Sequence, residues 1–134
     1  MKRLAMLVFA ACIAPAALVA QERNTGFMVQ QLCVASSEGV AFSNEAGNIT
    51  APILEDLREE GMISAWFELR HGWGDEWNVG TVTVAESHRA WLDFWSEFLS
   101  RVRAADPDLV AQMIASCELH KDNMYSVRNM GVGI

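Results

Sequence analysis

The sequence predicts an α+β domain whose elements follow the order strand, helix, strand, strand, helix, strand. Three observations support this prediction. Residues 62–70 alternate between two unlike sets of side chains, as expected for a strand with two different faces. Residues 77–85 are rich in Thr and Val and follow a glycine-containing turn at 71–76, which indicates a β-hairpin. Apolar residues recur at helical spacing before and after this hairpin, so a helix is expected on each side of it.

The first strand is predicted at residues 26–34, and both faces of its alternating pattern are mostly apolar. We therefore expect a central strand that is buried on both sides. The first helix is predicted from a stripe of apolar residues, namely Phe42, Ala46, Ile49, Ile53 and Leu57. Its regular part is expected at residues 52–60, because Pro52 suits a first turn and Thr50 can cap it. Gly61 would end this helix.

A longer helix is predicted after the hairpin, with Ser87 as its N-cap. Its core face is a stripe of aromatic and aliphatic residues, namely Trp91, Trp95, Phe98 and Val102. A short further helix is expected after Asp106 and Pro107, because aspartate caps helices and proline fits the first helical position. The last strand is predicted at residues 119–128.

This order of elements is that of a ferredoxin-like fold, a four-stranded antiparallel sheet with the helices on one face. The other face would then be left uncovered by its own chain. We expect the strand face that carries Trp66, Glu68 and Arg70 to be this uncovered face. An exposed face with bulky aromatic groups favours pairing of two chains, so a homodimer that closes face to face is predicted.

The N-terminus has the pattern of a secretory signal peptide. Lys2 and Arg3 precede a short apolar stretch, and Ala20 is a small residue at a plausible cleavage point. The stretch is too short for a transmembrane anchor. We therefore expect residues 1–20 to be a signal peptide, residues 21–134 to form a single domain, and the protein to be exported to the periplasm or secreted. Lipid attachment at Cys12 is the less favoured alternative, because only a short apolar run precedes it.

Removal of the signal peptide would lower the formal net charge from −7 to −9, since Lys2 and Arg3 are lost. Phosphate binding needs a basic face, and the sequence has no cluster of Lys and Arg. Nucleic acid is therefore not an expected partner. An anionic membrane surface is disfavoured for the same reason, and no membrane insertion is expected after signal cleavage.

Two cysteines, Cys33 and Cys117, would remain in the exported chain. They could form a disulfide, bind a metal or stay as buried thiols. In the predicted topology the first and last strands are antiparallel neighbours, and the two cysteines meet at the same end of that pair. The fold therefore favours a disulfide between Cys33 and Cys117.

The element order, the length and the aromatic hairpin followed by a Trp-rich helix resemble the dimeric α+β barrel superfamily. That superfamily includes antibiotic-biosynthesis-monooxygenase-like, haem-degrading and stress-responsive proteins. The strings at residues 71–78 and 120–125 are also similar to those of uncharacterised exported bacterial proteins of this shape. The resemblance implies the fold and a central cavity between two sheets, and it assigns no catalytic residue.

The hairpin turn concentrates His71, Trp73, Asp75, Glu76 and Trp77. Imidazole and carboxylate can bind a divalent metal, but the sequence has no second histidine at a suitable spacing. The turn is better explained as a structural feature, and no metal ligand is assigned. No cofactor is predicted, although haem and divalent metals stay open.

Two groups of residues could carry chemistry on the strands. Glu68 and Arg70 could line the cavity beside Trp66, with His71 at its mouth, or they could form an ion pair at the dimer interface. His120 and Asp122 share one strand face and could act as an acid–base pair, or they could be the polar start of the last strand.

The sequence thus predicts a homodimer that binds a small apolar or aromatic molecule between its subunits, through Trp66, Glu68, Arg70 and His71. A cofactor-independent oxygenase or isomerase that uses Glu68 or His120 for proton transfer is the first alternative. A purely structural or interaction module of the cell envelope is the second.

Overall fold

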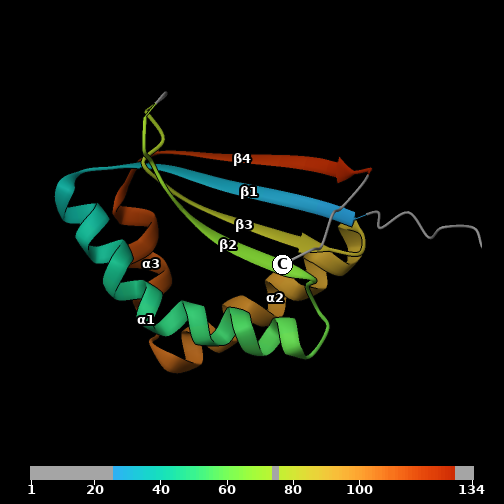
Figure 1. Ribbon diagram of the computed structural model, residues 1–134. Helices are drawn as coiled ribbons and strands as arrows, with labels where there is room; N and C mark the ends of the chain where they lie inside the picture. The colour runs from blue at the N-terminus through green and yellow to red at the C-terminus, as the bar shows by residue number, and fades with distance from the viewer. Residues whose placement is uncertain (1–25, 74–75, 129–134) are drawn as a thin grey trace, which may run out of the picture.

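The computed structural model describes residues 26–73 and 76–128, so the predicted signal peptide lies outside the described residues. This part of the chain contains four strands and three helices (Figure 1). In chain order they are β1 (Gly26–Ala35), α1 (Ser37–Glu59), β2 (Ala65–Arg70), β3 (Val79–Ala85), α2 (His88–Ala105), α3 (Leu109–Ala115) and β4 (Cys117–Val127). The predicted order of elements is confirmed, including the short extra helix before the last strand.

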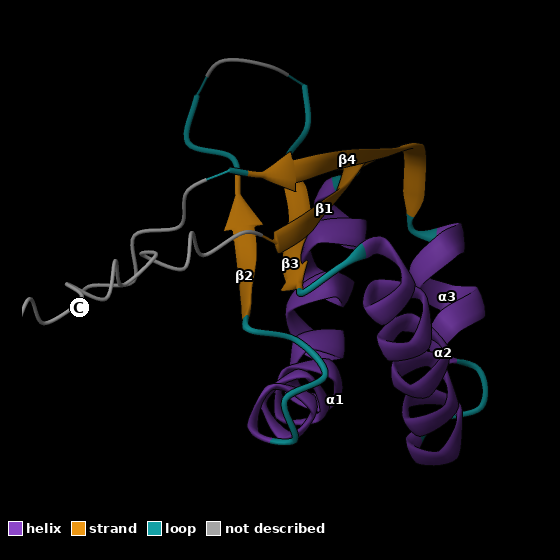
Figure 2. Cartoon of the chain, turned by 90° about the vertical axis from the view of Figure 1, so that its right-hand side faces the viewer, coloured by secondary structure: helices purple, strands orange, loops and turns teal. Residues whose placement is uncertain are grey.

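The four strands form one antiparallel sheet in the order β2-β3-β1-β4. Strand β1 therefore lies in the interior of the sheet, as predicted, but it is not buried on both sides in the single chain, because Met28, Gln30 and Leu32 on its second face are only partly buried. All three helices lie on the same side of the sheet, and none of the described elements covers the opposite side (Figures 1 and 2). The predicted fold class, a four-stranded antiparallel sheet with helices on one face, is confirmed.

The prediction of which face of β2 is uncovered was wrong. Trp66 pairs with Thr83, and Thr83 pairs with Val29, which is fully buried in the core under the helices. Residues of the same parity on β2, including Glu68 and Arg70, therefore face the helices. The alternation in the sequence separates two faces correctly, but it does not say which face is inside. The uncovered face instead presents Phe67, whose surface is 55% exposed.

The core lies between the covered face of the sheet and the helices. Its largest fully buried side chains are Phe94, Leu57, Ile63, Val29 and Val102. On α2, Trp91, Phe94, Phe98 and Val102 are buried, which confirms most of the predicted core stripe. Arg101 donates to Glu97 on α2 and also to Glu60 at the end of α1, and these contacts join the two long helices.

Helix α1 is longer than predicted. It begins at Ser37, with the Ser36 hydroxyl accepting a hydrogen bond from the Gly39 amide at 3.2 Å. Thr50, the predicted cap, lies inside the helix, and its hydroxyl donates to the Ala46 carbonyl. Pro52 is an interior residue that cannot donate a backbone hydrogen bond, and α1 changes direction part-way along its length (Figure 1). Burial of the apolar stripe therefore stabilises the helix by more than the hydrogen bond lost at Pro52 destabilises it.

The predicted ends of the other elements are close to those in the structure. Ser87 caps α2 through a hydrogen bond from the Ala90 amide, as predicted.

Cys33 and Cys117 form a disulfide with a Cα–Cα distance of 5.5 Å, which confirms the predicted pairing. This bond fastens β1 to the start of β4 over a sequence separation of 84.

Candidate functional site

A cavity of about 690 Å³ lies between the covered face of the sheet and the three helices. The sheet side of this cavity carries a polar row that crosses all four strands. Pairing places Glu68 of β2 opposite Thr81 of β3, Thr81 opposite Gln31 of β1, and Gln31 opposite Asp122 of β4. All four residues line the cavity. A polar row on the covered face of a sheet is unusual, because that face normally packs into an apolar core.

The helix side of the cavity is mostly apolar and aromatic. Its apolar lining side chains are Phe42 and Ala46 of α1, Trp91, Trp95, Phe98, Leu99 and Val102 of α2, and Val110, Met113 and Ile114 of α3, and its polar ones are Ser43 and Thr50 of α1 and Arg103 of α2. Trp91 and Trp95 are stacked with ring centroids 5.6 Å apart, and Phe98 stacks on Trp95 at 5.4 Å. The cavity therefore has one aromatic wall and one polar wall.

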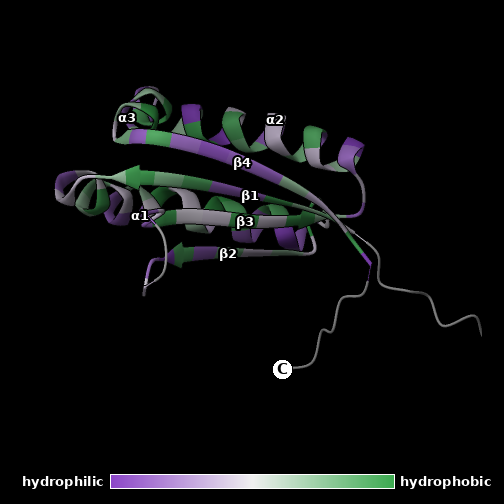
Figure 3. Cartoon of the chain, turned by 90° about the horizontal axis from the view of Figure 1, so that it is seen from above, coloured by the Kyte–Doolittle hydropathy of each residue, from purple (hydrophilic) through white to green (hydrophobic). Residues whose placement is uncertain are grey.

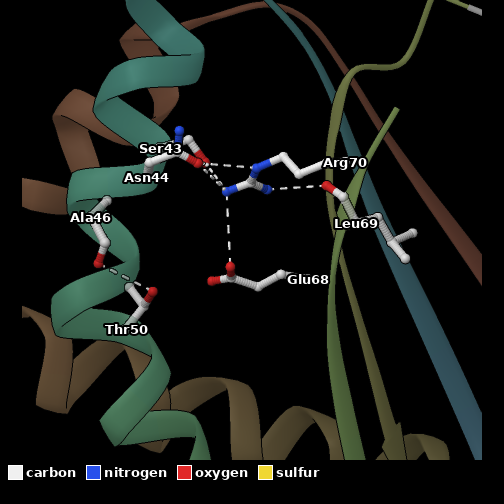
Figure 4. Close-up of polar contacts among 7 residues, drawn as sticks. All are labelled: Ser43, Asn44, Ala46, Thr50, Glu68, Leu69 and Arg70. Carbon is white, nitrogen blue, oxygen red and sulfur yellow. Dashed lines mark hydrogen bonds and ion pairs between the residues drawn. The ribbon is translucent and has the colours of Figure 1, made fainter. Parts of the chain in front are cut away.

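Arg70 is held against α1 by neutral acceptors (Figure 4). Its guanidinium donates to Asn44 Oδ1 at 3.2 and 3.0 Å, to Ser43 Oγ at 3.4 Å and to the Leu69 carbonyl at 3.0 Å. The nearest oxygen of Glu68 is 3.8 Å from Arg70 Nη2, which is an ion pair beyond hydrogen-bond distance. Arg70 therefore anchors the end of β2 to α1, with Glu68 as a looser neighbour.

The Glu68 carboxylate reaches from β2 toward α1 (Figure 4). It approaches α1 at Gly47, where an added Cβ would lie 3.3 Å from Glu68 Oε1. A glycine inside a helix costs stability relative to alanine, because its backbone loses more freedom on folding. The absence of a side chain at Gly47 leaves space for the Glu68 carboxylate.

His120 and Asp122 lie on β4, a largely hydrophilic strand at the opposite edge of the sheet (Figure 3). His120 Nε2 is 3.2 Å from Asp122 Oδ1, and both side chains line the cavity. This contact places a carboxylate beside one nitrogen of the imidazole. Tyr125 has the opposite parity and faces the uncovered side, as its position in the strand predicts.

The two candidate catalytic residues, Glu68 and His120, lie on strands at opposite edges of the sheet. Three strand spacings of about 4.8 Å separate these edges, or about 14 Å in all. Proton transfer requires hydrogen-bond distance or one bridging water. Glu68 and His120 therefore serve different parts of the cavity and cannot act on the same proton.

No family model matches the sequence, and no curated protein matches it. Solved structures do match. A dimeric ferredoxin-like protein from an uncultured marine organism has a TM-score of 0.65 at 12% identity, over 82% of this chain and 94% of that chain. A second such protein from an uncultured marine organism has a TM-score of 0.55 at 13% identity, over 81% and 98%.

A third match, from Jannaschia sp. CCS1, is a dimeric ferredoxin-like protein of unknown function. Its TM-score is 0.51 at 14% identity, over 77% of this chain and 97% of that chain. This chain has the ferredoxin-like fold. The expected resemblance to dimeric α+β barrel proteins is thus confirmed for the fold.

Within this ferredoxin-like domain, the predicted ligand-binding residues are only partly brought together. Glu68 and Arg70 line the cavity, whereas Trp66 packs against the hydrophobic core and donates from its indole to Glu55 of α1. His71 is exposed beyond the end of β2, and its backbone amide donates to the Asn78 carbonyl. His71 is not among the residues that line the cavity, so the structure does not support its predicted place at the cavity mouth.

The metal hypothesis for the hairpin turn involved Asp75, which lies outside the described residues. Among residues 26–73 and 76–128, no group of three or more His, Cys, Asp or Glu side chains could hold a metal ion. Among the helices of these described residues, none is long and apolar enough to cross a membrane.

Sequence reasoning missed Gln31 and Thr81 as site residues. Both are polar residues at positions of the same parity as buried strand residues, Val29 and Thr83, and this pattern was a usable signal. It also missed the second role of Trp91 and Trp95. They belong to the core as predicted, and both are also among the residues that line the cavity.

Proposed function

We propose that this chain binds a small molecule with an apolar or aromatic body in the cavity under its own sheet. The observation that carries the proposal is the pairing of an aromatic helix wall with a polar sheet wall around about 690 Å³. This volume falls within the range of small-molecule sites, which are mostly apolar with a few polar groups that fix orientation. The site lies within one subunit, because Glu68 and Arg70 face the helices of their own chain.

Calorimetric titration with 2-naphthylmethanol, a neutral aromatic probe, tests this proposal. We expect one molecule bound per chain, whereas a site between two subunits would bind one per pair. Thr81→Phe places an aromatic ring in the sheet wall and should abolish binding, because Thr81 lines the cavity. Ser96→Phe adds the same ring on the exposed side of α2 and should leave binding intact. Equal binding by both folded variants would contradict the proposal.

The proposed assembly is a homodimer that forms through the uncovered face. Phe67, Leu119 and Tyr125 are 55%, 58% and 46% exposed on this face. Among the strand residues of that face in the described chain, Lys121 is the one with a charge. A face with few charges and exposed aromatic groups suits a self-complementary contact. The three matching proteins above, which are described as dimeric, support the same assembly.

A second candidate function is acid–base catalysis in the same cavity, as in a cofactor-independent oxygenase or an isomerase. The contact between His120 Nε2 and Asp122 Oδ1 favours it, because a carboxylate that orients a histidine is a usable proton-transfer unit. Glu68 is the other candidate base. Catalysis would be supported if the protein oxidises or isomerises a bound probe, and if His120→Gln or Glu68→Gln abolishes this reaction while probe binding is retained. If no probe binds and the dimer forms, the structural or interaction role is favoured.

We also propose that the protein is exported after removal of residues 1–20. A disulfide persists in oxidising compartments such as the periplasm, which agrees with this location. Cell fractionation followed by N-terminal sequencing should give a mature protein that starts at Gln21. Native mass spectrometry of this material would report the oligomeric state and any retained ligand, haem or metal together.

A further inference from the structure

The ionisable groups around the cavity are more acidic than basic. The lining side chains include three carboxylates, Glu68, Glu118 and Asp122, and two guanidiniums, Arg70 and Arg103. His120 also lines the cavity, next to Asp122. With a neutral histidine, the lining therefore has an excess of one negative charge in a chain that is itself acidic. This balance favours a cationic ligand over an anionic one.

Both guanidiniums already have a role in the fold. Arg70 donates to Asn44, Ser43 and the Leu69 carbonyl, so its donors are directed toward neutral acceptors of the protein. Arg103 lies in the last turn of α2, where a positive charge complements the helix dipole. Because its donors are used in this way, Arg70 is not arranged as a bidentate anion site.

The Glu68 carboxylate is the best-placed acceptor in the cavity. Its nearest cation in the structure, Arg70, is 3.8 Å away and makes its hydrogen bonds elsewhere. The carboxylate lies against Gly47 of α1, where an added Cβ would be 3.3 Å from Glu68 Oε1, and the Glu68 side chain also lines the cavity. Its side chain is 36% exposed, which leaves oxygen surface for a further donor.

The aromatic wall begins close to Glu68. The Trp91 indole donates to Thr83 Oγ1 at 2.9 Å, and Thr83 lies two residues along β3 from Thr81, the partner of Glu68. Trp95 continues the stack from Trp91 at an interplanar angle of 9°. Tryptophan faces attract cations, and they also pack against flat apolar groups. One small ligand can therefore contact the carboxylate and the stacked indoles together.

We propose that the ligand is an amine whose protonated nitrogen binds Glu68 and whose apolar or aromatic body lies along Trp91 and Trp95. This inference rests on the proposed function and adds the chemical class of the ligand. The ammonium would donate to the Glu68 carboxylate, and its charge would be balanced by the acidic lining. No covalent step is involved.

Three probes that share one ring system test the inference, namely 2-naphthylmethylamine, 2-naphthylmethanol and 2-naphthoate. They are titrated into the purified full chain by calorimetry at neutral pH, where the amine is a cation and the naphthoate an anion. We expect the amine to bind about tenfold more tightly than the alcohol, and the naphthoate most weakly, because a charge-assisted hydrogen bond is the stronger kind.

Glu68→Gln keeps the shape of the side chain and should reduce amine affinity about tenfold, while alcohol affinity stays within about twofold. Glu45→Gln removes the same charge from an exposed position of α1 that does not line the cavity, and it should change neither affinity. Thermal unfolding of each variant confirms that it is folded.

The outcomes separate this inference from the proposed function. If none of the three probes binds, the proposed function fails as well. If the alcohol or the naphthoate binds as tightly as the amine, the cavity is a binding site but the amine class is wrong. If Asp122→Asn weakens amine binding and Glu68→Gln does not, the assignment to Glu68 is overturned.

Discussion

The Trp66 indole Nε1 donates a hydrogen bond to Glu55 Oε2 at 3.0 Å, and this contact joins β2 to α1. The same carboxylate accepts from Arg58 at 2.9 and 2.6 Å. Trp66 is therefore turned toward the helices of its own chain. Because Glu68 and Arg70 share its parity, the contact also marks the face on which the cavity lies.

Acid should weaken the fold partly through Glu55. Hydrogen bonds from Arg58 and Trp66 lower the pKa of Glu55 from 4.5 to about 2. A carboxyl group whose pKa is lower in the folded state stabilises the fold above pH 4.5, and this contribution is lost as the pH falls toward 2. Trp66→Phe removes one donor, so the free energy of unfolding should fall less steeply over this pH range than in the unmodified protein.

Urea unfolding at a series of pH values measures this difference. Trp73→Phe is the matched control, because Trp73 is 92% exposed. Its pH profile should follow that of the unmodified protein. Parallel profiles for Trp66→Phe and Trp73→Phe would show that the Trp66 contact does not hold the Glu55 charge.

The Cys33–Cys117 disulfide should stabilise the domain strongly. It closes a loop over a sequence separation of 84, and the chain-entropy model gives about 4–5 kcal/mol for such a loop. The double variant Cys33→Ala, Cys117→Ala should therefore lose about that much free energy of unfolding in urea titrations. Added reductant should weaken the unmodified protein and leave the double variant unchanged. Free thiols in non-reducing peptide maps of the unmodified protein would contradict the pairing.

Gly47 and Glu68 should be energetically coupled. Alanine favours a helix over glycine by about 1 kcal/mol, but a Cβ at Gly47 would crowd Glu68 Oε1 at 3.3 Å. Gly47→Ala should therefore stabilise a Glu68→Ala background more than it stabilises the unmodified protein. A double-mutant cycle by urea unfolding measures this coupling. Equal effects in the two backgrounds would mean that the glycine does not serve the carboxylate.

The sequence predicted the order, parity and approximate bounds of the strands, because alternation and turn residues are local signals. It could not predict which side of β2 faces the helices. Trp66, Glu68 and Arg70 are the more polar set, and a simple burial rule would also place them outside. They face inward because Glu55, Asn44 and Ser43 of α1 supply partners for the indole and the guanidinium. Those contacts depend on where α1 packs.

The candidate site was also partly predictable from local patterns in the sequence. Glu68 and Arg70 were predicted to line a cavity between two subunits, and His120 was a candidate for proton transfer; in the structure all three line the cavity under the sheet of their own chain. The disulfide followed from topology, since antiparallel neighbours bring Cys33 and Cys117 together. The start of α1 at Ser37 was not predicted, because Gly47 and Pro52 argue locally against a helix that tertiary packing nevertheless supports.

The uncovered face gives a prediction for the assembly. Analytical ultracentrifugation of the purified protein should give twice the mass of the mature chain. Phe67→Glu places a charge on that face and should shift the equilibrium toward the monomer, because Phe67 is exposed in the single chain. Leu92→Glu, at an exposed position of α2, is the control and should leave the dimer intact. A monomer at all concentrations would contradict the proposed homodimer.

The indole Nε1–H signals of the five tryptophans in nitrogen-15 correlation spectra test the central claim most directly. They report where a ligand binds without any substitution. On titration with 2-naphthylmethylamine, the signals of Trp91 and Trp95 should shift in a saturable manner, because both rings line the cavity. The signal of Trp73, whose side chain is exposed, should stay in place. Saturable shifts at Trp73 with Trp91 and Trp95 unmoved would contradict a binding site beneath the sheet.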